Sequence, residues 1–253
     1  MPADQKPVPS VWTRQRRQRE QPALSQERIV SEAVHLLDVD GIDALSMRSL
    51  GNRLGAGATS LYRHVATKDE LIELVVDEVY GELEVPDVTD PAHWREVAAR
   101  SAHDVRSMTL RHPWVAAVLG QVGLASLGPN LSRVSEGMLA LFEVAGFDLE
   151  EADQAMNTLI AYVIGMTTSE AAYLSMLARS GQTEQEWAES LRPAAEQAVK
   201  DHPRLSEGYA AHRDRDPRVI RDANFDYGLQ RVLDGLESRL DHLGGSPGSA
   251  LPT

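Results

Sequence analysis

Apolar residues recur at three- and four-residue steps along most of the chain, which is the spacing of one buried helix face. The first run follows Ser25 and stops at Gly41, residue types that favour the start and the end of a helix, so we expect a helix over about 25–40. Alternating apolar residues bounded by hairpin turns are absent from the sequence. The pattern therefore predicts an all-α protein.

Three further helices are predicted close behind the first. A helix over about 46–54 begins with a serine that can cap it, and the turn Gly55-Ala56-Gly57 leads to another helix over about 59–65. Thr67 begins a longer helix, and Glu70, three residues on, is placed to complete a capping box. Four short, closely spaced helices indicate a small helical domain.

Pro86 and Pro91 interrupt the pattern and separate a first domain over 25–85 from a second over 86–243. Helical spacing continues in the second domain. The helices expected there span about 92–111, 113–124, 130–145, 149–180, 184–200 and 218–242. The ends of the chain, residues 1–24 and 244–253, offer little apolar surface to bury, and we expect a flexible arm and a disordered tail.

Composition narrows the classes of function. Hydrophobic residues make up 42% of the chain and charged residues 25%, as in folded globular proteins. The chain has no cysteine, which excludes disulfides, thiolate zinc sites and cysteine nucleophiles, and we expect neither metal nor cofactor. No apolar stretch has signal-peptide or membrane-spanning length, so we expect a cytoplasmic protein without a membrane partner.

The net charge of −13 is unevenly distributed along the chain. Residues 1–70 carry 10 Lys+Arg against 9 Asp+Glu, whereas the remainder carries 15 against 29. Four arginines without an intervening acid lie ahead of the first helix: Arg14, Arg16, Arg17 and Arg19. Such an arm can enter a narrow minor groove of DNA. The alternative is a basic tail that only raises non-specific affinity.

A short helix, a glycine turn and a further helix within about 20 residues form the geometry that places one helix in the major groove of DNA. Leu50, Leu54 and Leu61 can pack these helices together, and polar side chains then remain at the tips. They are Thr59, Ser60, Tyr62, Arg63 and His64. Such side chains reach phosphates and base edges, although Tyr62 can also cover the small core.

At these residues the chain resembles the TetR family of repressors. Leu45–Gly51, Leu61–Val65 and Lys68–Leu71 look like the N-terminal domain of that family, and Phe225–Leu229 is similar to the last helix of one C-terminal subfamily. The resemblance implies an all-α homodimer that binds double-stranded operator DNA. It further implies a C-terminal domain in which a small-molecule effector binds and releases the DNA.

The resemblance also implies roles for single residues in DNA binding. The positions that match are Arg48 and Ser60 as base contacts, Tyr62 and His64 as recognition-helix contacts, and Lys68 as a phosphate anchor. We add Ser46, which lies at the start of the preceding helix. Ala58 stands where some relatives carry a base-reading glutamine and Arg63 where an aromatic residue is common, so the operator sequence does not carry over.

The helices of the second domain mix large, adaptable side chains with a few polar groups. That mixture is typical of a small-molecule pocket, although each of these residues taken singly more often belongs to an ordinary core. The resemblance favours the pocket for the set as a whole. The candidate ligand-binding residues are Met108, His112, Trp114, Gln121, Met138, Phe142, Asn157, Tyr162, Met166 and Tyr173.

The last predicted helix carries one broad apolar stripe. Its members repeat at three- and four-residue steps: Phe225, Leu229, Val232, Leu236 and Leu240. Such a stripe must be covered either by the same chain or by a two-fold partner. The family pairs this helix with the long helix near 149–180 in an intersubunit four-helix bundle, and we adopt that arrangement as the predicted dimer interface.

Two other classes of function compete with a ligand-responsive repressor. A helical enzyme is disfavoured because no nucleophile elbow, zinc-type histidine pair or paired catalytic motif is present. His103 and Asp104 are adjacent, and neighbours one apart on a helix point to different faces. The other competitor is a constitutive DNA-binding regulator without an effector, for which the second domain is larger than dimerisation requires.

Overall fold

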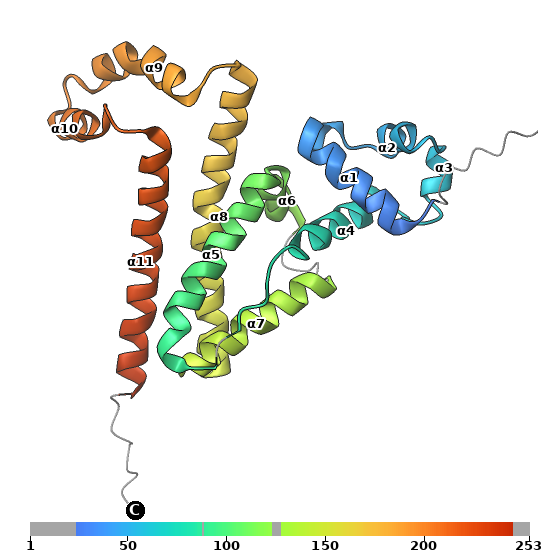
Figure 1. Cartoon of the computed structure of the whole chain (residues 1–253), viewed down its shortest axis with the longest axis horizontal. Helices are drawn as coiled ribbons and strands as arrows, with labels where there is room; N and C mark the ends of the chain where they lie inside the picture. The colour runs from blue at the N-terminus through green and yellow to red at the C-terminus, as the bar shows by residue number, and fades with distance from the viewer. Residues whose placement is uncertain (1–23, 88, 123–127, 245–253) are drawn as a thin grey trace, which may run out of the picture.

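The computed structural model describes residues 24–87, 89–122 and 128–244 and has no strand there, which confirms the all-α prediction. Figure 1 shows a small N-terminal group of helices set to one side of a larger C-terminal group. The N-terminal group comprises α1 (Gln26–Asp40), η1 (Ile42–Ala44), α2 (Met47–Leu54), α3 (Ala58–Leu61) and α4 (Lys68–Tyr80).

Local capping explains where the N-terminal helices start. The Ser25 hydroxyl accepts a hydrogen bond from the Arg28 amide at 3.3 Å, and the Thr67 hydroxyl accepts one from the Glu70 amide at 3.0 Å. The Glu70 carboxylate accepts a hydrogen bond from the Ala66 amide at 2.6 Å. In a regular capping box the Glu70 side chain would accept from the Thr67 amide. Here it accepts from the amide of the preceding residue, Ala66.

Glycines end two of these helices, as predicted. Gly41 follows α1 with φ of +77°, and Gly55 follows α2 with φ of +64°, both in the region that side chains other than glycine rarely adopt. At Gly51, inside α2, a Cβ would lie 2.8 Å from the Ala56 carbonyl oxygen. The turn between α2 and α3 therefore packs directly on α2.

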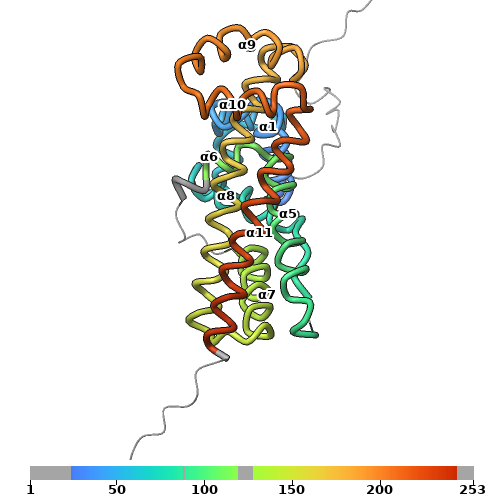
Figure 2. The backbone as a smooth tube through the Cα atoms, turned by 90° about the vertical axis from the view of Figure 1, so that its left-hand side faces the viewer, coloured from blue at the N-terminus to red at the C-terminus, as the bar shows by residue number. Residues whose placement is uncertain are grey.

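The C-terminal group is built around α8 (Leu149–Ser180). Its other elements are η2 (Pro91–His93), α5 (Trp94–Arg111), α6 (Trp114–Val122), α7 (Pro129–Ala145), α9 (Glu184–Val199), α10 (Pro203–His212) and α11 (Pro217–Gly244). Helices α5, α7 and α11 pack along α8, and Figure 2 shows α8 and α11 side by side on one face of the molecule. The α9–α10 hairpin projects from their shared end and contributes no buried residue.

Two contacts fix α11 against α8. The Tyr162 hydroxyl donates to the Phe225 carbonyl at 2.7 Å, and a Cβ at Gly228 would lie 2.3 Å from that hydroxyl, so the helices approach closely at a glycine. Arg106 of α5, which is 8% exposed, donates two hydrogen bonds of 2.8 Å to Glu170 and one of 2.7 Å to Asp222. Helices α5, α8 and α11 thus meet at one buried ion-pair network.

The structure departs from the predicted elements at two places. The helix expected over 59–65 is a single turn, α3, followed by turns in which the His64 and Val65 amides both donate to the Leu61 carbonyl. Helix α10 was not predicted, because none of its residues is buried and no apolar stripe marks it. The other predicted helices agree in place and type.

One continuous apolar core joins the two helical groups, from Ile29 in α1 to Leu233 in α11. Tyr80 at the end of α4 and Leu83 in the segment that follows belong to this core. A domain division after residue 85 stays a prediction, since the packing is unbroken across it.

Candidate DNA-binding surface and ligand cleft

Helix α3, the recognition turn formed by residues 62–65 after it, and the starts of α2 and α4 present an exposed polar surface. Tyr62 is 50% exposed, so about half of its surface is free to contact another molecule. The neighbouring predicted contacts Arg48, Thr59, Ser60, Arg63 and Lys68 are exposed, and His64 is half-buried. Leu50, Leu61 and Val65 beneath them are fully buried and hold the turn in place. This surface offers hydroxyl, guanidinium and ammonium donors of the kind that bind phosphates and base edges.

Two arginines near this surface differ in their surroundings. Arg53 of α2 donates to Glu32 at 2.6 Å and lies 3.2 Å from Asp40, both on α1. Arg63 is exposed, and within the described chain it has neither ion pair nor hydrogen bond. Arg63 is thus available to a ligand such as DNA, whereas Arg53 is committed to holding α2 on α1.

Ser46 has a structural role within the predicted DNA-binding set. Its hydroxyl accepts from the Ser49 amide at 3.0 Å, and the Ser49 hydroxyl in turn accepts from the Ser46 amide at 3.0 Å. This capping box starts α2 and so positions Arg48 in the first turn of the helix. The predicted arm contacts Arg14, Arg16, Arg17 and Arg19 lie outside the described residues.

Two polar junctions tie the DNA-binding helices to the C-terminal group. At the first, the Asp77 carboxylate of α4 accepts from the Asn130 and Leu131 amides, each at 3.0 Å, and so caps the N-terminus of α7. A Cβ at Gly128 would lie 2.2 Å from the Asp77 carboxylate, so the chain here must be glycine to let α4 approach. Helix α7 is therefore anchored on α4.

At the second junction, His112 lies between two carboxylates. Its Nδ1 is 2.7 Å from Asp38 on α1, and its Nε2 is 2.9 Å from Glu82 just beyond α4. Trp114 donates from its indole nitrogen to the same Asp38 oxygen at 2.7 Å. Burial would raise the pKa of Glu82, but hydrogen bonds from Arg111 and His112 outweigh it and hold the pKa below its ordinary value of 4.5.

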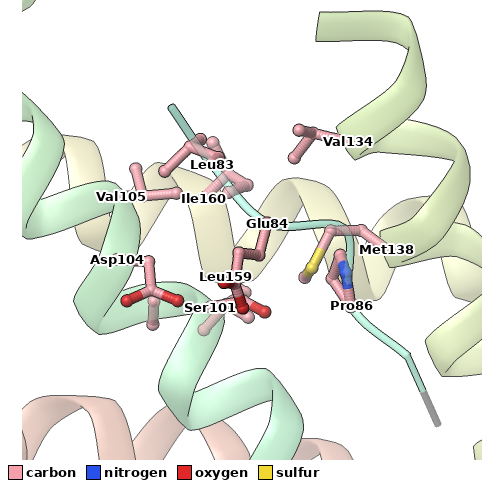
Figure 3. Close-up of a pocket in the computed structure, with 11 residues that line it drawn as sticks. Leu83, Glu84, Pro86, Ser101, Asp104, Val105, Val134, Met138, Leu159 and Ile160 are labelled. Carbon is pink, nitrogen blue, oxygen red and sulfur yellow. The ribbon is translucent and has the colours of Figure 1, made fainter. Parts of the chain in front are cut away.

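The largely apolar cleft of the C-terminal group opens beside the segment that follows α4 (Figure 3). Its cavity volume is about 20 Å³, room for about one water molecule. Its lining comes from that segment and from α5, α7 and α8: Leu83, Glu84, Pro86, Ser101, Ala102, Asp104, Val105, Val134, Met138, Leu159 and Ile160. Mostly apolar walls are typical of small-molecule sites, but such sites are larger, so a ligand that binds here must widen the cleft.

Of the predicted ligand-binding residues, Met138 lines this cleft. His112 and Trp114 belong instead to the junction with α1, and Met108 and Phe142 are fully buried core residues. The sequence missed Leu83, Glu84 and Pro86, because the signal sought was helical spacing and these residues lie between helices. Apolar residues in a proline-bounded linker are the signal that could have found them.

The remaining predicted ligand residues lie apart from the cleft. Asn157 is exposed and donates to Asp153 at 3.0 Å, and Tyr162 donates to α11. Met166 and Tyr173 line a shallow depression between α8 and α11. Gln121 lies in α6, and its side chain is outside the described part of the structure.

The predicted dimer stripe on α11 needs correction at two of its residues. Phe225 is 1% exposed and Leu229 is 0% exposed within the single chain, so no partner can cover them further. Val232, Leu236 and Leu240 are partly buried against the same core. The helix spacing identified the stripe correctly, but α5 and α8 of the same chain cover it.

In the described residues, no group of three or more His, Cys, Asp or Glu side chains is placed to hold a metal ion. No helix in the part of the chain that the structure describes is long and apolar enough to span a membrane.

Comparison with known proteins finds a matching family for each of the two helical groups. Residues 29–75 match the family "Bacterial regulatory proteins, tetR family", and residues 86–240 match "Tetracyclin repressor-like, C-terminal domain", more than half of the chain. The chain belongs to the TetR family. This TetR-family protein is 38% identical over 231 residues to an HTH-type transcriptional regulator of Saccharopolyspora erythraea, which covers 90% of this chain and 91% of the relative.

Two further TetR-family comparisons are informative. The HTH-type transcriptional repressor DrrR1 of Streptomyces coeruleorubidus is 31% identical, over 85% of this chain and 78% of DrrR1. The structure of ActR from Streptomyces coelicolor in complex with actinorhodin superposes with a TM-score of 0.71 at 30% identity, over 86% of this chain and 97% of ActR. The two relatives compared by sequence are transcriptional regulators. The exposed helix-turn-helix surface of this TetR-family protein is of the kind that such regulators use to bind DNA.

Proposed function

We propose that this protein is a dimeric, cytoplasmic, non-enzymatic repressor that binds operator DNA through α2 and α3 and releases it when a small molecule fills the cleft. One observation carries the proposal. Helix α4 begins at Lys68, next to the recognition turn, and the chain that continues it lines the cleft at Leu83. A single segment therefore touches both the DNA-binding surface and the ligand cleft.

The packing of this segment supports a mechanical link. Val85 presses on α7, since a Cβ at Gly137 would lie 2.4 Å from its Cγ1 atom. Val134 and Met138 of α7 line the cleft, and Asp77 joins the start of α7 to α4. A ligand that separates the linker from α7 would move α4 and with it the recognition turn. Release requires the ligand to favour the non-binding conformation, by about 1–3 kcal/mol for typical coupling.

The outer face of α8 and α11 is the surface we propose for dimerisation. It carries exposed apolar side chains, Met166 at 36% and Tyr227 at 66% exposure, beside small residues such as Ala161 and Gly165. Figure 2 shows the two helices forming a layer that, over most of its length, no other described helix covers on that side. Two-fold pairing of this layer gives a four-helix bundle and holds two recognition turns at a fixed separation.

Matched arginine variants test the DNA-binding surface. Arg63→Ala should weaken binding to DNA from the gene's own upstream region about tenfold and reduce the salt slope by about 1, because a direct contact is lost. Arg53→Ala should change affinity little, since that side chain is held by Glu32 and Asp40. Fluorescence anisotropy across a salt series measures both. Equal effects of the two variants would contradict the assignment of Arg63 to the DNA surface.

Operator release distinguishes the ligand-responsive repressor from its competitors. A constitutive regulator would bind the operator with an affinity that no cleft-binding molecule changes. An enzyme would convert the molecule it binds, which product analysis after incubation detects. The ActR complex with actinorhodin supports the repressor, since a protein of the same fold binds a small molecule.

A further inference from the structure

Asp38, near the end of α1, joins the DNA-binding group to the corner between α5 and α6. Its Oδ1 atom lies 2.7 Å from His112 Nδ1 and accepts a hydrogen bond of 2.7 Å from the Trp114 indole N–H. His112 is 7% exposed and Trp114 is 4% exposed, whereas the Asp38 side chain is 28% exposed. Two buried rings of the C-terminal group thus hold one carboxylate that belongs to α1.

Helix α1 in turn contacts two parts of the DNA-binding group. At its start, Gln26 Nε2 donates to the His64 carbonyl of the recognition turn at 3.3 Å. Toward α2, Glu32 and Asp40 hold Arg53 at 2.6 and 3.2 Å. Because α1 is one unbroken helix, a displacement of its far end would reach both the recognition turn and α2.

The other side of the junction leads to the cleft. His112 Nε2 lies 2.9 Å from Glu82, which also accepts a hydrogen bond from Arg111 at 2.6 Å. Glu82 immediately precedes Leu83 and Glu84, which line the cleft. A molecule that widens the cleft against this segment would displace Glu82 relative to His112.

We propose that His112 and Trp114 are positioning residues for DNA binding. Both hold α1 through Asp38, and His112 couples the position of α1 to that of Glu82 and the cleft. The inference rests on the proposed function, for which it names a route of regulation. This route is separate from the contact between Asp77 and α7, because it reaches the recognition turn through α1. A buried network of hydrogen bonds that touches both sites can carry such coupling.

Two acids of the DNA-binding group test the route. Asp38→Ala removes the contacts to both rings, whereas Asp43→Ala removes an exposed acid of η1 that has neither ion pair nor hydrogen bond within the described chain. Loss of a negative charge alone favours DNA binding, so Asp43→Ala should leave operator affinity unchanged or slightly higher. Asp38→Ala should instead weaken it about three- to tenfold, as measured by fluorescence anisotropy on the gene's own upstream DNA. Equal effects of the two variants would overturn the inference.

A double variant tests whether His112 joins the two sides of the junction. Glu82→Gln should weaken operator binding by a factor similar to that of Asp38→Ala. Combining the two should change the affinity by less than about twofold beyond either alone, because both act through the same ring. Parental affinity in Glu82→Gln, or fold-changes that multiply, would overturn the route. Asp148→Ala, which removes the cap of α8, is the stability control and should keep parental affinity where every variant is folded.

Hydrogen exchange without DNA separates this inference from the proposed function. The amides of residues 58–65 should exchange at least about threefold faster in Asp38→Ala than in the parent, Asp43→Ala or Asp148→Ala, because the recognition turn loses its support. If exchange rises in this way but no upstream DNA binds, the proposed function fails and the route to the recognition turn stands. Parental exchange over 58–65 in Asp38→Ala would overturn the route, whether or not DNA binds.

Discussion

At the scale of single residues, His112 shows that a residue whose type suggests ligand binding can have a structural role instead. Its two imidazole nitrogens lie within hydrogen-bond distance of one carboxylate on α1 and another beyond α4. The side chain is 9% exposed, so this contact is shielded from water. His112, at the C-terminal end of α5, therefore joins α1 to the segment beyond α4, and it does not line the cleft.

The pKa of Glu82 at this junction gives a pH prediction. Because the folded-state pKa lies below 4.5, Glu82 stabilises the fold above pH 4.5, and this contribution is lost as the pH falls through the folded value. Glu82→Gln should lower Tm near pH 7, and the difference from the parent should vanish in stronger acid. Thermal melts between pH 3 and 7 measure this.

Glu78→Gln is the control for Glu82, because Glu78 is an exposed acid in the last turn of α4, four residues before Glu82. It should leave the pH profile of Tm unchanged. A Glu82→Gln profile parallel to that of the parent down to pH 3 would contradict the role given to the Arg111 and His112 contacts.

At the scale of elements, helix α7 takes its N-terminal cap from another helix. Asp77 of α4 supplies it, whereas Asp148 caps α8 from the adjacent position, accepting from the Glu151 amide at 2.9 Å. The two aspartates make the same kind of bond at the start of two long helices. The cap from Asp77 also joins the DNA-binding group to the C-terminal group.

This difference predicts different outcomes for the two cap variants. Asp77→Ala and Asp148→Ala should each lower the free energy of unfolding by about 1 kcal/mol, the usual cost of losing an N-cap. Operator affinity should change several-fold in Asp77→Ala alone, since only that variant frees α4 from α7. Denaturant titration and anisotropy measure the two effects. Equal operator affinity in both variants would show that the α4–α7 contact does not position the recognition turn.

At the scale of the whole molecule, the two faces of α11 differ in what covers them within the chain. The inner face, with Phe225 and Leu229, completes the core of one chain. The outer face, with Tyr227, is left exposed beside the outer face of α8. Dimerisation by the outer face requires no exposure of the core, so each protomer can fold before it pairs.

Charges on the outer face should therefore dissociate the dimer without unfolding the chain. Met166→Glu with Tyr227→Glu would place carboxylates in the proposed four-helix bundle, where an unpaired charge costs several kcal/mol. Sedimentation velocity should show monomers with a near-parental Tm, and operator binding should be lost at working concentrations. Val39→Glu, on a residue of α1 that is 64% exposed, is the control and should remain dimeric. A dimer that survives the double change would move the interface elsewhere.

The sequence by itself determined most of the helices and the exposed polar residues around α3. Each helix is defined by signals that lie within it or next to it. These signals are the spacing of its apolar residues, a capping residue such as Ser25 or Thr67, and the glycines that stop α1 and α2. Their effect can therefore be predicted from neighbouring residues in the sequence. The polar residues around Tyr62 were predictable for the same reason, because the whole motif lies within one short stretch. Helix α10 escaped, since it buries nothing and so has no apolar stripe.

Only the tertiary structure decided what meets across the chain. Asp38 reaches His112 over 74 positions, and Asp77 reaches Asn130 over 53, and no local pattern encodes such pairs. The same holds for the cleft, because its walls come from a linker and three helices. It holds also for the α11 stripe, because the apolar pattern is the same whether the helix is covered by its own chain or by a partner. Spacing fixes which face of a helix is buried, and the packing of distant helices determines what buries it.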